Sequence, residues 1–101
     1  MMNPTMMCTT TTDNFAPGIR ACIKDAQDNF FLLTTPDMHS YKPYCEHLLA
    51  CASEEQSDFL FALAYFCLMH YYSNDNDHEE AIRCALEGIK YQQKAHEYEF
   101  I

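Results

Sequence analysis

The stretch DFLFALAYFCLMHYY, residues 58–72, decides the fold of this chain. Between Asp58 and Asp75 no residue carries a fixed charge, and apolar side chains fall on every side of a helix drawn through the run. A helix that is apolar all round has to be covered all round. We therefore expect an interior helix, with neighbouring helices before and after it in the chain.

The same run is too short to be a membrane span. From Phe59 to Tyr72 it would extend about 21 Å as a helix, against about 30 Å of hydrocarbon in a bilayer. Acidic residues flank it on both sides, whereas membrane spans favour Lys or Arg on one flank. Its Ala, Leu and Met residues favour a helix over a buried strand. The run thus predicts a helix enclosed by protein.

The whole chain is small and acidic. Its 101 residues suit one small domain, and 15 Asp and Glu against 6 Lys and Arg give a formal charge of −9. This charge repels phosphate backbones and anionic lipid, so neither nucleic acid nor a membrane is expected as a partner.

The N-terminal stretch MMNPTMMCTTTTDN has neither the basic region nor the continuous apolar region of a secretory signal. Residues 1–14 are predicted to be a flexible lead-in. A chain that is not exported keeps its cysteines reduced, so we expect a cytoplasmic protein with free thiols.

Three amphipathic segments accompany the uncharged run. Residues 16–33 and 40–52 each carry apolar side chains at intervals of three and four, and Pro43 places the start of the second helix near residues 40–42. Ser53–Gln56 has the pattern of a capping box and is expected to open the third helix. Asp77 is expected to cap the fourth. The chain is thus predicted to be all-α, with its helical domain over residues 15–94.

The four predicted helices recur with a regular period. The first and third begin about 38 residues apart, and the second and fourth about 37 apart, as in helical-repeat arrays. We therefore expect two antiparallel helical hairpins stacked on one another, with a four-helix bundle as the alternative.

The second hairpin carries a more specific pattern. Tyr65, Leu68, Met69 and Tyr72, followed by Ala81, have the spacing of the tetratricopeptide motif, W-x-x-L-G-x-x-Y and then A. Residues 56–94 therefore resemble a tetratricopeptide repeat, although Met69 stands where that repeat favours a small residue and no proline closes it. The first hairpin matches by length and pattern only. The expected repeat-packing residues are Tyr65, Leu68, Met69, Tyr72, Ala81, Ala85 and Gly88.

The resemblance implies a module that binds a protein or peptide in a groove, with no catalytic residue, cofactor or metal. The expected groove residues are Lys24, Gln27, Phe66, His70 and Ser73. The chain is also similar to N-terminal regions of some bacterial signalling proteins, including diguanylate cyclases, in which the repeats are an input or assembly module. The final residues, 95–101, lack a helix stop signal and are expected to begin a further helix that is cut short. Self-association through exposed repeat ends is expected as well.

Two alternatives remain open from the sequence. The first is a small metal- or redox-responsive regulator, because His47 and Cys51 lie four apart on one predicted helix, and Cys67 and His70 three apart on another. Four such nitrogen and sulfur ligands would satisfy zinc. The second is a chaperone of the secretion type from the same repeat family, which requires that the complete protein ends at Ile101.

Overall fold

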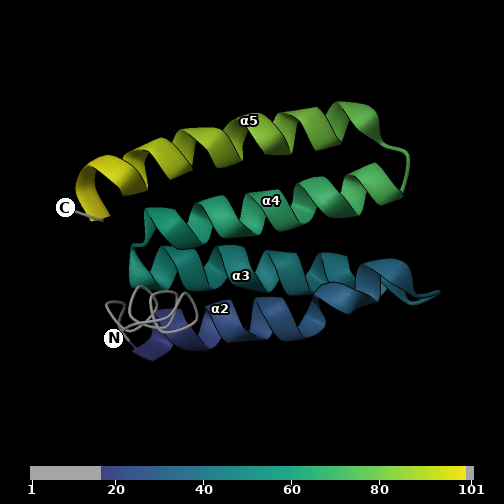
Figure 1. The fold of residues 1–101 in the computed structure, drawn as a ribbon, viewed down its shortest axis with the longest axis horizontal. Coiled ribbons are helices and arrows are strands. Elements are labelled where there is room, and N and C mark those ends of the chain that lie inside the picture. The colour runs from purple at the N-terminus through teal and green to yellow at the C-terminus, as the bar shows by residue number, and fades with distance from the viewer. Residues whose placement is uncertain (1–16, 100–101) are drawn as a thin grey trace, which may run out of the picture.

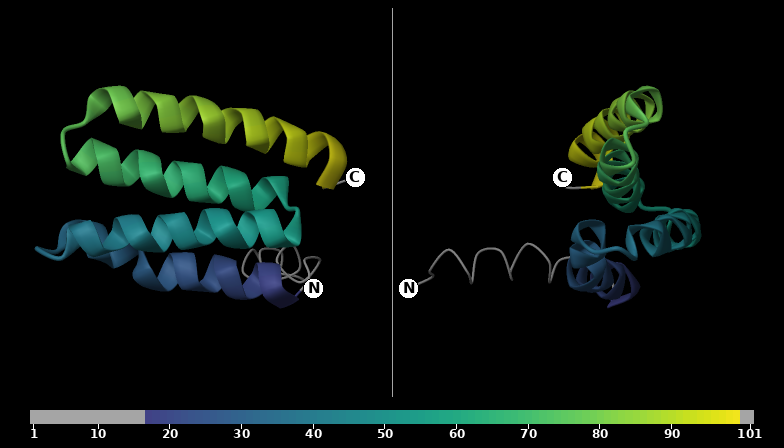
Figure 2. Two further views of the ribbon diagram at one scale, coloured as in Figure 1. Left: turned by 180° about the vertical axis from the view of Figure 1, so that it is seen from behind. Right: turned by 90° about the vertical axis from the view of Figure 1, so that its right-hand side faces the viewer.

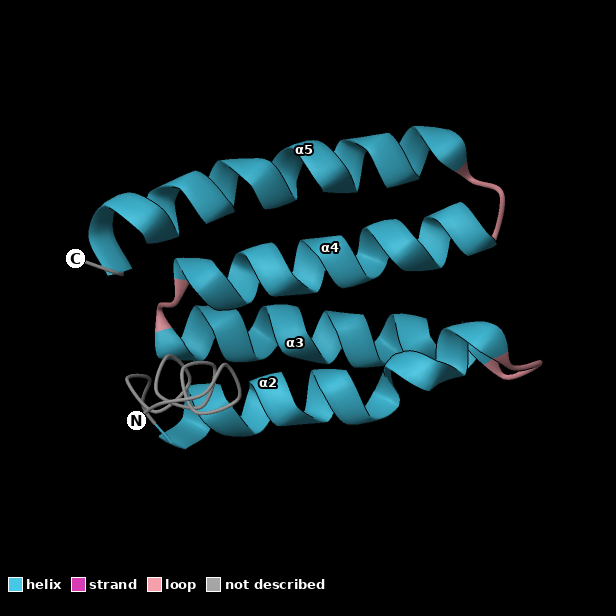
Figure 3. Ribbon diagram, in the orientation of Figure 1, coloured by secondary structure: helices cyan, strands magenta, loops and turns pink. Residues whose placement is uncertain are grey.

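The computed structural model describes residues 17–99, with only the backbone described for Glu99. Every regular element in this range is helical and none is a strand, which confirms the all-α prediction (Figures 1 and 3). The elements are α2 (Pro17–Asn29), the 3-10 turns η1 (Phe30–Thr34) and η2 (Met38–Ser40), α3 (Tyr41–Glu55), α4 (Asp58–Asn74), α5 (His78–Lys94) and the π-helical turn η3 (Ala95–Glu99). The predicted lead-in, residues 1–14, lies outside the described range.

Consecutive helices run antiparallel, so that α2 pairs with α3 and α4 pairs with α5 (Figure 1). Helix α4 contacts α3 and α5, and it also touches α2. Seen along the helices, α5 lies beyond α4, away from α2 and α3 (Figure 2). Both expected arrangements, two stacked hairpins and a four-helix bundle, fit this packing. The relationship to tetratricopeptide repeats stays a prediction.

Helix α4 is the interior helix that its sequence predicts. Leu60 and Ala64 are completely buried, and Leu68 and Tyr71 are nearly so. Only three residues of this helix are exposed, and they lie in its last two turns: His70, Ser73 and Asn74. The buried side of α4 packs against the buried side of α3, which includes Tyr41, Cys45 and Leu48. Burial of these apolar surfaces is the main stabilising contribution to the fold.

The boundary between α3 and α4 differs from the predicted one. Ser53 does not open a helix, because α3 continues to Glu55 and ends at Gln56, which adopts the left-handed conformation with φ of 51°. Ser57 caps α4 instead, and its side-chain oxygen accepts a hydrogen bond from the Leu60 N–H at 3.2 Å. The capping-box prediction is therefore wrong by four residues. The reason is that Ala52 is wholly buried, which holds the preceding turn in α3.

The predicted cap of the last helix is confirmed. The Asp77 carboxylate accepts a hydrogen bond from the Glu80 N–H at 3.3 Å, which satisfies one of the unpaired donors at the start of α5. At its other end α5 continues to Lys94 and passes directly into η3, with no loop before residues 95–99. Residues 100–101 of the expected further helix lie outside the described range. Ala95 in η3 is buried, and this turn contacts α4.

The first helix is shorter than predicted. Helix α2 ends at Asn29, whose side-chain amide donates a hydrogen bond to the Asp25 carbonyl at 2.8 Å and so occupies a helical acceptor. The chain then tightens into η1, which ends at Thr34 because Pro36 favours the extended conformation that Thr35 adopts. Phe30, the first residue of η1, lies beside His70 of α4, which matters for the site described next.

Candidate functional site

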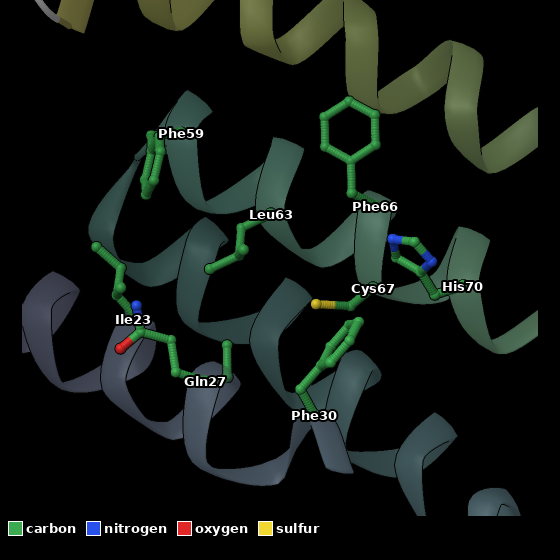
Figure 4. Close-up of a pocket in the computed structure, with 9 residues that line it drawn as sticks. Ile23, Gln27, Phe30, Phe59, Leu63, Phe66, Cys67 and His70 are labelled. Carbon is green, nitrogen blue, oxygen red and sulfur yellow. The ribbon is translucent and has the colours of Figure 1, made fainter. Parts of the chain in front are cut away.

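The least covered side of α4 faces α2, and a groove opens between these two helices (Figure 4). Its volume is about 530 Å³, within the range of sites that hold small molecules or a few side chains. The lining residues are Ile23, Ala26, Gln27 and Phe30 from α2 and η1, and Phe59, Leu63, Phe66, Cys67 and His70 from α4. None of these side chains carries a fixed charge, so the groove suits an apolar occupant.

The α2 wall of the groove is built by helical periodicity. Ile23, Ala26, Gln27 and Phe30 recur at intervals of three and four residues, which places them on one face of the helix and the turn that follows it. Ala26 is buried at the base, whereas the Phe30 ring is 44% exposed at the rim. The edge of this ring contacts His70, with centroids 5.4 Å apart and planes at 86°. A large aromatic side chain left half open to water offers a favourable contact to an apolar ligand.

The α4 wall is supported from behind by α5. Phe66 points from α4 toward α5 (Figure 4), and its ring lies directly on Gly88. A Cβ atom at Gly88 would come within 2.9 Å of the Phe66 ring, closer than side chains pack. The absence of a side chain at Gly88 therefore fixes the position of one aromatic residue in the groove.

Cys67 lies at the base of the groove and is almost entirely buried. It interacts with Cys45 of α3, and this hydrogen bond, together with burial, raises the pKa of the Cys45 thiol. Burial also raises the pKa of Tyr41, whose hydroxyl interacts with Cys67. Low-dielectric surroundings disfavour the charged forms of these groups. Cys67 itself differs, because its hydrogen bond with Cys45 favours the thiolate and lowers the pKa of Cys67 to about 7. The base of the groove therefore holds one thiol that ionises near physiological pH.

The structure brings together three of the five predicted groove residues. Gln27, Phe66 and His70 line the groove, but Lys24 does not, because its exposed ammonium pairs with Asp28 at 3.0 Å on the outer side of α2. Ser73 lies in a shallower depression between α4 and α5, which also includes His70.

Six further lining residues were not predicted as groove residues: Ile23, Ala26, Phe30, Phe59, Leu63 and Cys67. Ile23 and Phe30 belong to the apolar stripe of α2 and Phe59 and Leu63 to the uncharged run, so the sequence assigns them to the core. Such residues stay half-exposed when two helices do not approach closely enough to seal the apolar faces between them. The sequence does not predict the distance between two helices.

The predicted repeat-packing residues lie along the contact between α4 and its neighbours. Tyr65 stacks on Tyr91 of α5, with centroids 5.8 Å apart and planes at 8°. Leu68, Ala81 and Gly88 are buried, and Met69, Tyr72 and Ala85 are half-buried. The Lys42 ammonium lies 5.6 Å from the centre of the Tyr72 ring.

The four residues of the alternative metal site do not converge. His47 and Cys51 are neighbours on α3, with Nε2 and Sγ 3.5 Å apart, whereas Cys67 interacts with Cys45 and His70 contacts Phe30. Within residues 17–99 no three His, Cys, Asp or Glu side chains are grouped so that they could hold a metal ion. The four-ligand arrangement is therefore not formed.

A second apolar surface lies on the outer side of α5. Ile82, Leu86 and Ile89 follow one another at helical spacing and are 61%, 63% and 44% exposed. An exposed apolar stripe of this kind is where a second copy of the chain would bind in the expected self-association. That self-association stays a prediction.

Comparison with known proteins gave no match to a family model, to a characterised protein or to a solved structure. Among the described helices, none is both long enough and apolar enough to cross a bilayer.

Proposed function

We propose that this chain is a non-catalytic interaction module that binds a segment of a partner protein in the groove between α2 and α4. The observation that carries the proposal is an open groove, lined by side chains without a fixed charge and by half-exposed aromatic residues, on a helical scaffold. Grooves between helices commonly receive the apolar face of a peptide, whose anchoring side chains then leave water.

The charge of the chain defines the partner further. The groove itself supplies apolar contact, but the chain as a whole has a net charge of −9. One of its carboxylates is close to the groove, because Asp58 directly precedes the lining residue Phe59. An acidic surface attracts basic segments over a distance of about one Debye length, roughly 8 Å at physiological salt. We therefore expect a partner segment with two or three large apolar anchors flanked by Lys or Arg.

The size of the groove supports anchors of this kind. A volume of about 530 Å³ accommodates a few large side chains, and the polar groups of Gln27 and His70 lie at its edge. Both side chains are exposed, so their polar groups are free to form hydrogen bonds with the backbone of a bound peptide. Apolar anchors would supply the affinity and these polar contacts the orientation.

A matched pair of substitutions tests the proposal. Gln27→Lys places a positive charge at the groove, whereas Gln92→Lys adds the same charge at an exposed position on α5. The probe is a synthetic basic peptide with Leu and Phe anchors at helical spacing, and its binding is measured by fluorescence anisotropy. We expect Gln27→Lys to weaken binding roughly fivefold, because one added like charge near the site costs about 1 kcal/mol.

The control separates the groove from the overall charge. Gln92→Lys should bind the peptide within about twofold of the unmodified chain, since a distant exposed charge is largely screened. Equal weakening by both substitutions would mean that the peptide responds to net charge alone. Undiminished binding of a peptide with Ala in place of its anchors would likewise refute the role of the groove.

The wider setting of the module also remains a proposal. We infer that it serves as the N-terminal input or assembly region of a larger bacterial signalling protein, as its resemblance to tetratricopeptide arrays suggests. Sequencing of the gene beyond the codon for Ile101 tests this, because the proposal requires an open frame that continues into an output domain.

A further inference from the structure

We propose that Cys22 and Cys51, assisted by His47, form a thiol–disulfide site that links α2 to α3 when it is oxidised. This site is separate from the groove, and its chemistry does not depend on what the groove binds. It uses thiols from two helices whose positions in the sequence give no indication that they meet.

Cys22 and Cys51 lie on helices that pack against one another, α2 and α3. Cys51 is close enough to Cys22 to raise its pKa, and both side chains are half-buried. The pKa of Cys22 is raised to about 11, first by burial and then by Cys51, Asp25 and Glu55. Cys22 is therefore a poor attacking group at neutral pH, which leaves the attack to Cys51.

His47 is placed to assist Cys51. Its Nε2 lies 3.5 Å from the Cys51 Sγ, one helical turn earlier on the exposed side of α3. A neutral imidazole at this distance can accept the thiol proton, and the thiolate is the reactive form of cysteine. The pair is accessible to small reagents, because His47 is exposed and Cys51 is only half-buried.

The other described cysteines differ in access. Cys45 and Cys84 are completely buried, so a dissolved oxidant does not reach them in the folded chain, and Cys67 at the base of the groove is only 4% exposed. Cys45 and Cys67 also interact, but they lie in the core between α3 and α4. Of the described thiol pairs, the one formed by Cys22 and Cys51 is therefore open to reaction.

The chemistry balances with a small disulfide such as oxidised glutathione as the oxidant. The Cys51 thiol gives its proton to His47, and the thiolate attacks one glutathione sulfur, which breaks the glutathione S–S bond and releases one glutathione thiolate. That thiolate takes up a proton. Cys22 then attacks the Cys51 sulfur, which forms the protein disulfide and breaks the bond between Cys51 and glutathione. The second glutathione leaves as a thiolate and takes up the proton that Cys22 loses. The protein is oxidised by two electrons, and one glutathione disulfide is reduced to two thiols.

The bond would act on the groove through α2. Cys22 is followed directly by Ile23, which lines the groove, and α2 is attached to the remaining helices by fewer contacts than α4 is. A covalent link to α3 would hold this wall in one position. We therefore expect oxidation to change the rate at which a ligand enters or leaves the groove.

The experiment treats the full-length chain with oxidised glutathione and counts free thiols and bound glutathione by mass spectrometry of the intact protein. All measurements use a Cys8→Ser background, because Cys8 lies outside the described residues. The parent should lose two thiols and retain no glutathione. Cys22→Ser should retain one glutathione on Cys51, since the resolving thiol is missing, and Cys51→Ser should react at least several-fold more slowly than the parent.

A His47→Gln variant separates a chemical role from a structural one. It should slow the first step several-fold and leave the reduction potential of the Cys22–Cys51 pair unchanged, because His47 acts on the rate alone. Circular dichroism verifies that each variant folds. The proposal is overturned if the parent retains glutathione without forming a disulfide. It is also overturned if either single variant, Cys22→Ser or Cys51→Ser, still loses two free thiols and forms a disulfide. A shifted potential in His47→Gln would remove His47 from the proposal.

Discussion

Replacing Gly88 by Ala should destabilise the protein, although the same substitution usually stabilises a helix. Gly88 lies within α5, where Ala is favoured over Gly by about 1 kcal/mol. Here, however, the new Cβ would lie 2.9 Å from Cε1 and 3.0 Å from Cδ1 and Cζ of Phe66. Overpacking of this kind costs about 1–3 kcal/mol.

The two contributions give a net loss. Subtracting the gain in helix propensity from the middle of the overpacking range leaves a destabilisation of about 1 kcal/mol. The Phe66 ring lies between α4 and α5 and borders the groove, so it can relieve the contact only by moving into the groove. We also expect its displacement to weaken binding of the basic peptide.

Gly18 offers a matched control. A Cβ at Gly18 would meet the Glu55 carboxylate, with Oε1 at 2.5 Å, but this side chain is exposed and can swing away. Gly18→Ala should therefore stabilise the chain by about 0.5 kcal/mol, through helix propensity and the lower entropy of the unfolded chain.

Urea unfolding followed by circular dichroism measures both variants. The account expects opposite signs for Gly18→Ala and Gly88→Ala. Combining Gly88→Ala with Phe66→Leu should recover part of the loss, as a positive coupling in a double-mutant cycle. If Gly88→Ala stabilised the protein as much as Gly18→Ala does, the close contact between α5 and Phe66 would be refuted.

Three further predictions follow from the helix caps and the thiols. Ser57→Ala should lower the free energy of unfolding by about 1 kcal/mol or more, because it removes the cap of α4. Ser53→Ala should change that free energy by less than about 0.5 kcal/mol, because Ser53 is exposed and caps no helix. Chemical denaturation of both variants measures the difference. The pKa of Cys22 is raised in the folded chain from 9.0 to about 11, so the unfolded chain loses that proton first. Its contribution to stability is present below pH 9.0 and is lost as the pH rises to about 11, a loss that Cys22→Ser should reduce in melting curves recorded across this range. Formation of the Cys22–Cys51 disulfide closes a loop of about 30 residues and should stabilise the chain by about 3 kcal/mol, as a comparison of oxidised and reduced protein would measure; an unchanged melting temperature would contradict it.

The interior position of α4 could be predicted because it depends on composition alone. A helix with no fixed charge from Phe59 to Asn74 has no side that water would favour, whichever way it is turned. The cap at Asp77 could be predicted for a similar reason, since it needs only one acidic residue before an amphipathic run. Both features are local, and the structure confirms both.

The start of α4 could not be placed correctly because two serines compete for it. Ser53 and Ser57 both precede the uncharged run, and the sequence pattern favours Ser53, which has Gln56 three residues later. The choice is made by packing, since burial of Ala52 keeps the turn around Ser53 in α3. Tertiary contacts of this kind are not visible in a local motif.

The groove and the thiol site depend on contacts between segments far apart in the chain. Phe30 and His70 meet because the start of η1 continues the face of α2 that lies toward α4, and Cys22 lies near Cys51 because α2 packs against α3. Helical periodicity predicts which residues share a face. It does not predict how closely two faces approach, and this distance decides whether an apolar stripe is sealed or left open as a groove.

An NMR titration with the basic peptide tests the groove most directly, because it distinguishes the two apolar surfaces of the chain. Methyl signals of Ile23 and Leu63 report on the groove, and those of Ile82 and Leu86 report on the exposed stripe of α5. The account predicts that saturating peptide shifts the signals of Ile23 and Leu63 and leaves those of Ile82 and Leu86 in place. Shifts confined to the α5 stripe would contradict it.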